Sequence, residues 1–262
     1  TALATTVRRT CSRPTRSTLR QDVTVDREGW MDLLGLDTDE LPRLLVLEST
    51  WWRRRALSRR LARLEDVREL GMPDLWHGWY GDVPVAYCPA YGATRSVEPV
   101  HVLGVCGTPV VVSVGACASL QPKVKLGDVV LSERATIGEG ASQYYGAKGS
   151  VAANLGRVTR AAALFAGRDT FTHRGPTVTA GALLAQTPKH VERWASTGHL
   201  AVDLTSSAIF AAASAFSMRA ASVHFVREEL PGRPWTEQVT EAEEQLLEDV
   251  SEAVYDVALG LV

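Results

Sequence analysis

Long apolar runs, lysine and cysteine are all scarce in this chain of 262 residues. No stretch reaches the roughly 18 apolar residues of a membrane helix, and the first residues lack the basic-then-apolar pattern of a secretory signal. We therefore expect no membrane segment and a cytoplasmic location. The 4 cysteines include no C-x-x-C pair, so we expect neither a disulfide framework nor a zinc site.

The short signatures of several enzyme classes are also absent. There is no GxxxxGK[ST] loop, no GxGxxG after a strand and no GxSxG elbow, which removes the main support for an NTPase, a Rossmann dehydrogenase or an α/β-hydrolase. The 6 histidines show neither H-x-x-x-H nor HExxH spacing. We therefore expect no metal site and no cofactor.

What is present is typical of a globular protein, with 45% hydrophobic and 22% charged residues. The net charge of -2 hides an uneven distribution, because the N-terminus is rich in arginine and the C-terminal segment is rich in acids. Residues 1–25 have almost no apolar periodicity, so we expect a flexible arm there and a single domain over residues 26–262. We expect no nucleic-acid partner.

Apolar runs alternate with helical patterns along this domain. The runs that predict strands are 44–47, 83–87, 109–114, 129–131, 199–204 and 222–226, and the helical stretches are 52–65, 96–106, 153–167, 206–217 and a last helix after Thr240. Such alternation predicts an α/β fold with a mostly parallel or mixed sheet.

Two of the predicted helices carry charge of one sign. The helix at 52–65 contains six arginines, and the last helix, whose Thr240 and Glu243 have capping-box spacing, is acidic on one face. We expect most of these arginines, and the acidic face of the last helix, to be solvated.

The order of several sequence blocks resembles the nucleoside phosphorylase superfamily. Residues 110–120 (VVVSVGACASL) and 122–130 (PKVKLGDVV) are similar to that family's strand, Gly-rich turn and "vk-x-GD-v-v" strand. Residues 142–145 (SQYY), 200–208 (LAVDLTSSA) and 218–222 (MRAAS) follow, in the positions of the family's later elements. The resemblance spans the chain from Leu44 to the C-terminus.

The uridine phosphorylase branch is the most similar. Gln186 and Arg227 correspond to the glutamine and arginine that contact the uracil base in that branch. The resemblance implies a three-layer α/β/α sandwich around a mixed, twisted sheet and a nucleoside-like small-molecule ligand. It also implies a homodimer or a hexamer of three dimers, with sites at the dimer interface.

The apparatus that would hold phosphate departs from the family pattern. The family's "G-D-x-x-R" turn is represented by residues 48–52 (ESTWW), which places Glu48 where an anion should bind. Ser113 occupies the position of a phosphate-binding arginine of the family, and Ala116 that of a phosphate-binding threonine. Thr205 occupies the position of the glutamate that binds the ribose hydroxyls. The resemblance therefore implies chemistry at the N-glycosidic bond without a conventional phosphate site.

Water could then attack in place of phosphate, which requires a carboxylate base and an acid for the leaving group. The catalytic candidates are Asp203, Arg227 and Glu48, with Glu228 as a further carboxylate. Each has a structural alternative. Glu48 could pair with a nearby arginine at a strand end, Asp203 could cap the helix at 206–217, and Arg227 could pair with a neighbouring glutamate.

The candidate substrate-binding residues come from the same blocks and from segments near the family's pocket. They are Gln186, Thr205, Ser113, Gly115, Tyr91, Arg95, Trp52 and His77. Two alternatives to a hydrolase stay open. Arg53, Arg54 or Arg95 could rebuild an anion site in a true phosphorylase, or the chain could be a catalytically silent ligand-binding or scaffold protein.

Overall fold

The computed structural model describes residues 25–51, 53–230, 232 and 237–262, so most of the predicted N-terminal arm lies outside it. Within these residues, ten strands form one sheet. They are β1 (Leu44–Ser49), β2 (Glu65–Glu69), β3 (Trp76–Tyr80), β4 (Val83–Pro89), β5 (Val110–Ser119), β6 (Val129–Gly138), β7 (Ser150–Ala152), β8 (Thr172–Ala180), β9 (Ala201–Asp203) and β10 (Arg219–Glu229).

The sheet is mixed, and half of it closes on itself. Parallel pairs join β4, β1, β5 and β10, whereas β2 and β3 continue the open edge as antiparallel strands. Beyond the end of β1, the last residues of β5 pair with β9, the strands β8 and β6 follow in turn, and β6 pairs with β10, which itself pairs with β5. The long strand β5 is therefore the point where the open sheet and the closed ring of strands meet.

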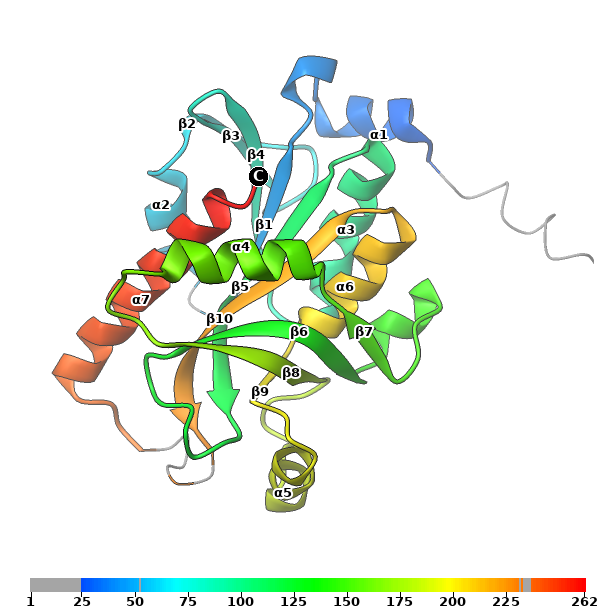
Figure 1. Cartoon of the computed structure of the whole chain (residues 1–262). Coiled ribbons are helices and arrows are strands. Elements are labelled where there is room, and N and C mark those ends of the chain that lie inside the picture. Colours follow the sequence, from blue (N-terminus) through cyan, green and yellow to red (C-terminus); the bar gives the residue numbers. More distant parts are fainter. Residues whose placement is uncertain (1–24, 52, 231, 233–236) are drawn as a thin grey trace, which may run out of the picture.

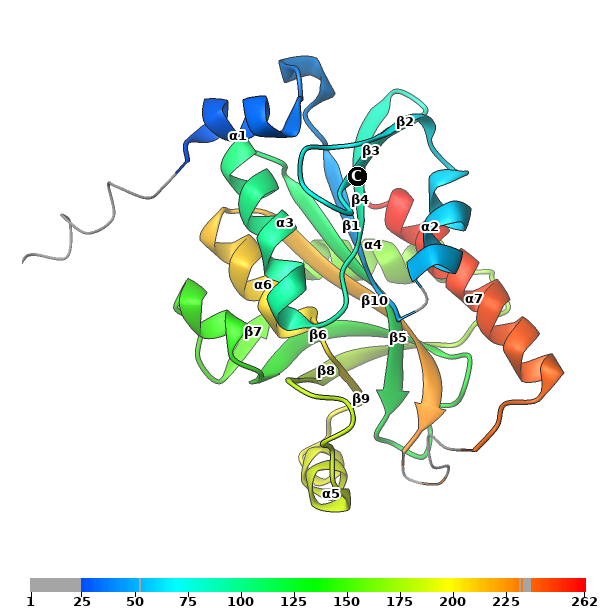
Figure 2. The ribbon, with the colours of Figure 1, turned by 180° about the vertical axis from the view of Figure 1, so that it is seen from behind.

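Helices cover both faces of the sheet. They are α1 (Arg27–Leu34), α2 (Arg53–Leu61), α3 (Ala93–Cys106), α4 (Leu155–Phe165), α5 (Pro188–Ser196), α6 (Ser206–Ala215) and α7 (Glu241–Leu259), with short 3-10 turns η1 (Thr38–Glu40) and η2 (Ala141–Tyr145). Helices α2, α4 and α7 lie on one face (Figure 1) and α3 and α6 on the other (Figure 2). The expected three-layer α/β/α sandwich with a mixed sheet is confirmed.

Each predicted apolar run contributes to a strand, and the helical stretches are also present. The clearest case is Leu44–Leu47, which lies between β4 and β5 with each side chain at most 1% exposed, as a run buried on both faces requires. The predicted capping box of α7 is present, because Thr240 and Glu243 bond each other's backbone N–H groups.

The sequence patterns missed several elements, namely α1, α5, β2, β3, β7 and β8. Strand β2 (EDVRE) lies at the sheet edge and is mostly exposed and polar, so it carries no apolar run. Strand β8 (THRGPTVTA) contains Gly175 and Pro176, which signal a turn more often than a strand. No helix of the described residues has the length and apolar character that would let it cross a membrane.

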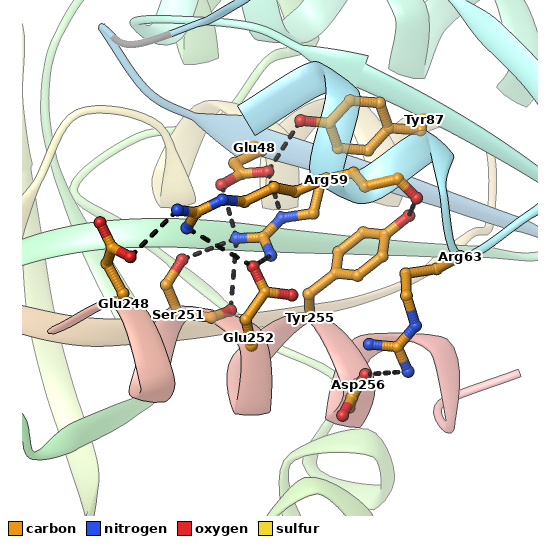
Figure 3. Close-up of polar contacts among 10 residues, drawn as sticks. Glu48, Arg59, Arg63, Tyr87, Glu248, Ser251, Glu252, Tyr255 and Asp256 are labelled. Atoms are coloured by element: carbon orange, nitrogen blue, oxygen red, sulfur yellow. Dashed lines mark hydrogen bonds and ion pairs between the residues drawn. The ribbon is translucent and has the colours of Figure 1, made fainter. Parts of the chain in front are cut away.

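Arg54 and Arg63 are exposed and Arg59 is partly exposed, whereas Arg60 is buried. Helices α2 and α7 pack with opposite charges toward each other, as Figure 3 shows. Arg59 lies 3.0 Å from Glu248, and Arg63 lies 2.6 Å from Asp256. Because these pairs are partly exposed, each contributes only about 0.2 to 1 kcal/mol. Together they fix how the two helices face each other.

Arg60 lies deeper in the same contact and binds Glu48 at the end of β1. The Arg60 guanidinium donates from Nε and Nη2 to the two carboxylate oxygens of Glu48, at 2.9 and 3.1 Å. Both residues are buried, at 2% and 4% exposure. Tyr87 donates its hydroxyl to the same carboxylate at 2.7 Å (Figure 3). Glu48 is therefore held by three charge-assisted hydrogen bonds.

The rest of the Arg60 side chain is also occupied by groups of α7. Its Nη2 donates to Ser251 Oγ at 2.6 Å, its Nη1 lies 2.8 Å from Glu252, and its guanidinium carbon lies 4.8 Å from the centre of the Tyr255 ring. Burial alone would lower the pKa of Arg60, but the charges of Glu48 and Glu252 raise it above its ordinary value. Arg60 therefore stays charged and joins β1, α2 and α7.

We predict that Arg60→Ala lowers the free energy of unfolding by about 3 to 5 kcal/mol, because it leaves the buried Glu48 carboxylate without its cation. Arg54 is exposed on the same helix, so Arg54→Ala is the matched control and should change stability by less than about 0.5 kcal/mol. Urea unfolding of both variants measures the difference. Equal losses in the two variants would contradict the assignment.

Candidate functional site

The candidate site lies at the middle of β5, where the open sheet meets the closed ring of strands. Gly115 pairs with Ser49 of β1 on one side and with His224 of β10 on the other. It has φ +137°, and a Cβ added there would lie 2.7 Å from the Ser49 carbonyl oxygen. Only glycine allows this close approach of β1. Gly115 was expected to bind substrate, and it is placed at the centre of the site.

A chain of buried polar side chains lies between β5, β10 and the start of α6. Ser113 Oγ lies 3.2 Å from Thr205 Oγ1 and 3.0 Å from His224 Nε2, and Ser222 Oγ lies 2.8 Å from Ser206 Oγ. Burial lowers the pKa of His224, an effect partly opposed by the charge of Asp203. The predicted residue Ser113 therefore bonds both Thr205, which was also predicted, and a neutral His224, which the sequence patterns did not single out.

Asp203 ends β9 and binds backbone N–H groups at the start of α6, the structural role weighed for it from the sequence, although Thr205 is the residue at the N-cap position. Its Oδ1 accepts hydrogen bonds from the backbone N–H groups of Thr205 and Ser206, both at 2.7 Å, and from the Thr179 hydroxyl at 3.1 Å. Its Oδ2 is buried and has no hydrogen-bond partner among the described residues. One carboxylate oxygen is thus structural, and the other is left to accept a bond.

Arg227 lies on a β-bulge, where the pairing of β10 with β5 shifts between Val226 and Glu228. A bulge takes the extra residue out of the ladder and redirects its side chain, and bulges are common beside active sites. In the part of the chain that the structure describes, the Arg227 side chain makes no hydrogen bond or ion pair, although its charge acts on Glu228. Its guanidinium is therefore available to a ligand.

Glu228 and Asp203 lie on either side of β5. Ala118 pairs with Glu228 of β10 and with Val202 of β9, so Asp203 comes next to Cys117. Burial raises the pKa of the Cys117 thiol well above its ordinary value, and the charges of Asp203 and Glu228 add to the effect. Burial also raises the pKa of Glu228, against the opposing charge of Arg227. The neighbourhood of Cys117 thus holds two carboxylates and one guanidinium.

Two aromatic rings border this neighbourhood, and a buried amide lies in the segment that follows β8. Tyr91 follows β4 and packs on Trp51, with ring centroids 5.4 Å apart, and burial raises the pKa of its hydroxyl, with the charge of Glu228 adding to it. Gln186 follows β8, whose Thr179 pairs with Asp203. Its Nε2 is buried without a hydrogen-bond partner among the described residues. A buried unpaired polar group costs about 1 to 3 kcal/mol, which a ligand could offset.

Glu139 is a residue of this region that sequence reasoning missed. Its carboxylate accepts hydrogen bonds from the Ser142 hydroxyl and backbone N–H, and from the Ser207 hydroxyl at 2.9 Å. It therefore ties η2 to the first turn of α6. No local motif marks it, because its partners come from two separate segments.

Other predicted residues lie away from this neighbourhood or outside the description. Arg95 is directed to residues 73–74 and to Glu98, which lies 3.3 Å from it. His77 is buried in β3 and lies 2.9 Å from the Glu40 carbonyl oxygen. Glu48 is occupied by Arg60 and Tyr87, and Arg54 is exposed. Trp52 and the side chain of Arg53 lie outside the described residues.

The cysteines and metal-ligand residues add little to the site. Cys88, Cys106 and Cys117 are buried and form no disulfide among the described residues, whereas Cys11 lies outside the description. Among the described residues, no group of three or more His, Cys, Asp or Glu side chains is arranged to hold a metal ion. The arrangement around Cys117 offers acid–base and electrostatic groups.

Comparisons with known proteins agree with this architecture. Two solved structures of uridine phosphorylase from Vibrio fischeri ES114, one of them complexed with 6-hydroxy-1-naphthoic acid, each superpose with a TM-score of 0.74. Each is 17% identical to this chain, covering 86% of it and 93% of the other chain. At this identity the likeness establishes the fold. No curated protein sequence matches the chain significantly.

A sequence-family model supplies the stronger assignment. The model described as "Phosphorylase superfamily" matches residues 52–260, which is most of the chain. The matched region contains β5, Asp203, Arg227 and Glu228, so it includes the whole neighbourhood of Cys117. The family resemblance of the sequence blocks is therefore confirmed, and the chain belongs to the phosphorylase superfamily.

Proposed function

We propose that this protein is an enzyme that cleaves the N-glycosidic bond of a nucleoside-like compound with a pyrimidine-like base, and that water replaces phosphate as the nucleophile. One observation carries the proposal. The bulge at Arg227 presents a guanidinium without a hydrogen bond or ion pair among the described residues, beside Glu228 and near Asp203. The substrate class is supported by Gln186, whose buried Nε2 donor has no hydrogen-bond partner among the described residues.

The roles follow from the charge that develops as the bond breaks. Cleavage of the C1′–N bond leaves its electron pair on the heterocycle, where the Arg227 guanidinium stabilises the negative charge. Glu228, whose pKa is raised by burial, donates the proton that the departing base takes up. Asp203 accepts a proton from the attacking water through Oδ2, and the water oxygen forms the new bond to C1′.

Glu48, one of the catalytic candidates from the sequence, has a structural role in this proposal. Its carboxylate already accepts two hydrogen bonds from Arg60 and one from Tyr87, so it has no role as a base. The Arg60 charge is already paired with Glu48 and Glu252, so it is not available to a phosphate anion. This pairing, together with the engagement of Arg95 elsewhere, is the physical support for a reaction without phosphate.

Release of free base from a panel of nucleosides, followed by chromatography with and without phosphate, tests the proposal. We expect release that does not depend on phosphate. Release that requires phosphate would instead support a true phosphorylase with a relocated anion site. No release from any nucleoside would favour the alternative of a ligand-binding or scaffold protein.

We predict that Arg227→Gln lowers kcat by about 100-fold to 1000-fold, the usual cost of losing one group that stabilises transition-state charge. Arg219 is exposed at the other end of β10, so Arg219→Gln is the control and should keep full activity. The two variants should unfold within about 0.5 kcal/mol of the native chain. Full activity of the Arg227 variant would refute its role.

We predict a pH dependence that Glu228 controls. A general acid works only while protonated, so activity is present below its pKa and falls as the pH rises through it. Because burial raises the pKa of Glu228, the falling limb should lie above the ordinary glutamate value of 4.5. A pH profile of kcat/KM for native protein and Glu228→Gln measures this. The same limb in both proteins would exclude Glu228 as the acid.

A further inference from the structure

A hollow on the described part of the molecule is lined by residues that the candidate site does not include. It is a cavity of about 440 Å³ between α1, residues 71–73, α3 and the end of η2. Figure 2 shows α1 beside one end of α3. This volume is within the range of about 300 to 1000 Å³ that small-molecule sites occupy.

The walls of the cavity are mainly apolar. Trp30 and Leu33 come from α1, Met72 from the segment before β3, and Val102 from α3. Leu33 is 60% exposed although it is a large apolar side chain. The Trp30 ring and the flexible Met72 thioether lie beside Leu33, and together they can pack against a flat apolar ligand.

One pair of polar side chains interrupts this apolar lining. The Tyr145 hydroxyl lies 3.3 Å from His101 Nδ1. Burial lowers the pKa of His101, which keeps its ring neutral at pH 7. If the Tyr145 hydroxyl donates to His101 Nδ1, then Nε2 carries the ring hydrogen and can donate to a ligand, while the Tyr145 oxygen can accept. In the other tautomer Nδ1 donates to the Tyr145 oxygen, so the hydroxyl can donate to a ligand and Nε2 can accept. Either way, the pair offers one donor and one acceptor.

The polar pair is held in place from behind. The His101 ring packs edge-on against Phe216, with centroids 4.7 Å apart. Gly104 lies on α3 one turn after His101, and a Cβ there would be 2.7 Å from the Phe216 ring. Phe216 therefore fills the space behind the cavity wall. Groups fixed in this way lose little entropy when a ligand binds.

The charge at the rim favours a neutral ligand. Glu98 lines the cavity, and its carboxylate is paired with Arg95 at 3.3 Å. The lining side chains include no lysine or arginine. An anionic ligand would therefore meet a carboxylate and no free cation.

We propose that this cavity binds a neutral, flat, two-ring aromatic compound that carries an adjacent N–H and C=O. The rings lie against Trp30, Leu33 and Met72, and the N–H and C=O pair with His101 and Tyr145. None of its lining residues is one of those assigned to the neighbourhood of Cys117, and its occupation does not depend on the reaction proposed there.

Calorimetric titration of the full chain with isoquinolin-1(2H)-one tests this proposal. We expect saturable binding with one site per chain and a Kd below about 1 mM. Tyr145→Phe should weaken binding about 3-fold to 10-fold, the value of one neutral hydrogen bond. Tyr144 is 90% exposed next to it, so Tyr144→Phe is the matched control and should bind normally.

A second variant keeps the test independent of folding. Leu33→Glu changes an exposed side chain at the mouth, so the fold should be retained while binding weakens about 10-fold or more. The anion isoquinoline-1-carboxylate should also bind at least about 10-fold more weakly.

Three outcomes would overturn the proposal. The first is no saturable binding to the native chain. The second is binding that Leu33→Glu and Tyr145→Phe leave unchanged, which would place the probe elsewhere. The third is that the native chain forms an assembly that does not bind the probe, and that sedimentation shows Leu33→Glu to be a monomer. The cavity would then be a contact between copies of the chain.

Discussion

The buried ion pair between Glu48 and Arg60 is the interaction on which the rest of the structure depends. It joins the end of the central strand β1 to α2, and through Ser251, Glu252 and Tyr255 it reaches α7. A buried carboxylate is tolerable only with a cation and well-placed hydrogen bonds, and Glu48 has both. The last helix is therefore bound to the first strand by charge as well as by apolar packing.

This pair also decides what the end of β1 can bind. A carboxylate that is neutralised within the fold presents neither a free base nor a positive site. Binding of a polar ligand is thus left to the next strands, where Gly115 lets β1 approach β5 closely and where β9 and β10 bring Asp203 and Glu228 to either side of Cys117. The residues that stabilise the fold, at the end of β1, are therefore different from the candidate catalytic residues on β9 and β10 of the same sheet.

Much of the fold could be predicted from the sequence because buried strands leave apolar runs. Leu44–Leu47 and residues 222–226 carry this signal, and Thr240 with Glu243 marks the start of α7 through local bonds. The edge strand β2 and the Pro-containing β8 lack such a signal. The local sequence of these two strands has only a weak preference for strand structure, and their pairing with neighbouring strands determines it.

The site was predictable to a smaller extent. The blocks around Gly115, Asp203 and Arg227 carry the family resemblance, and capping by Asp203 was foreseeable from its place before a helix. The bulge at Arg227 was not, because a register shift depends on the partner strand. The pairing of Arg60 with Glu48 and Glu252 joins segments that are distant in sequence, and no single-sequence pattern indicates which arginine of α2 points inward.

The most direct test of this account is a calorimetric titration of the native chain with inorganic phosphate. If the Glu48–Arg60 pair has replaced an anion site, phosphate should show no saturable binding up to about 10 mM, and Glu48→Gln should create or strengthen binding by freeing the Arg60 charge. Saturable binding of phosphate to the native chain, unchanged in Glu48→Gln, would contradict the account.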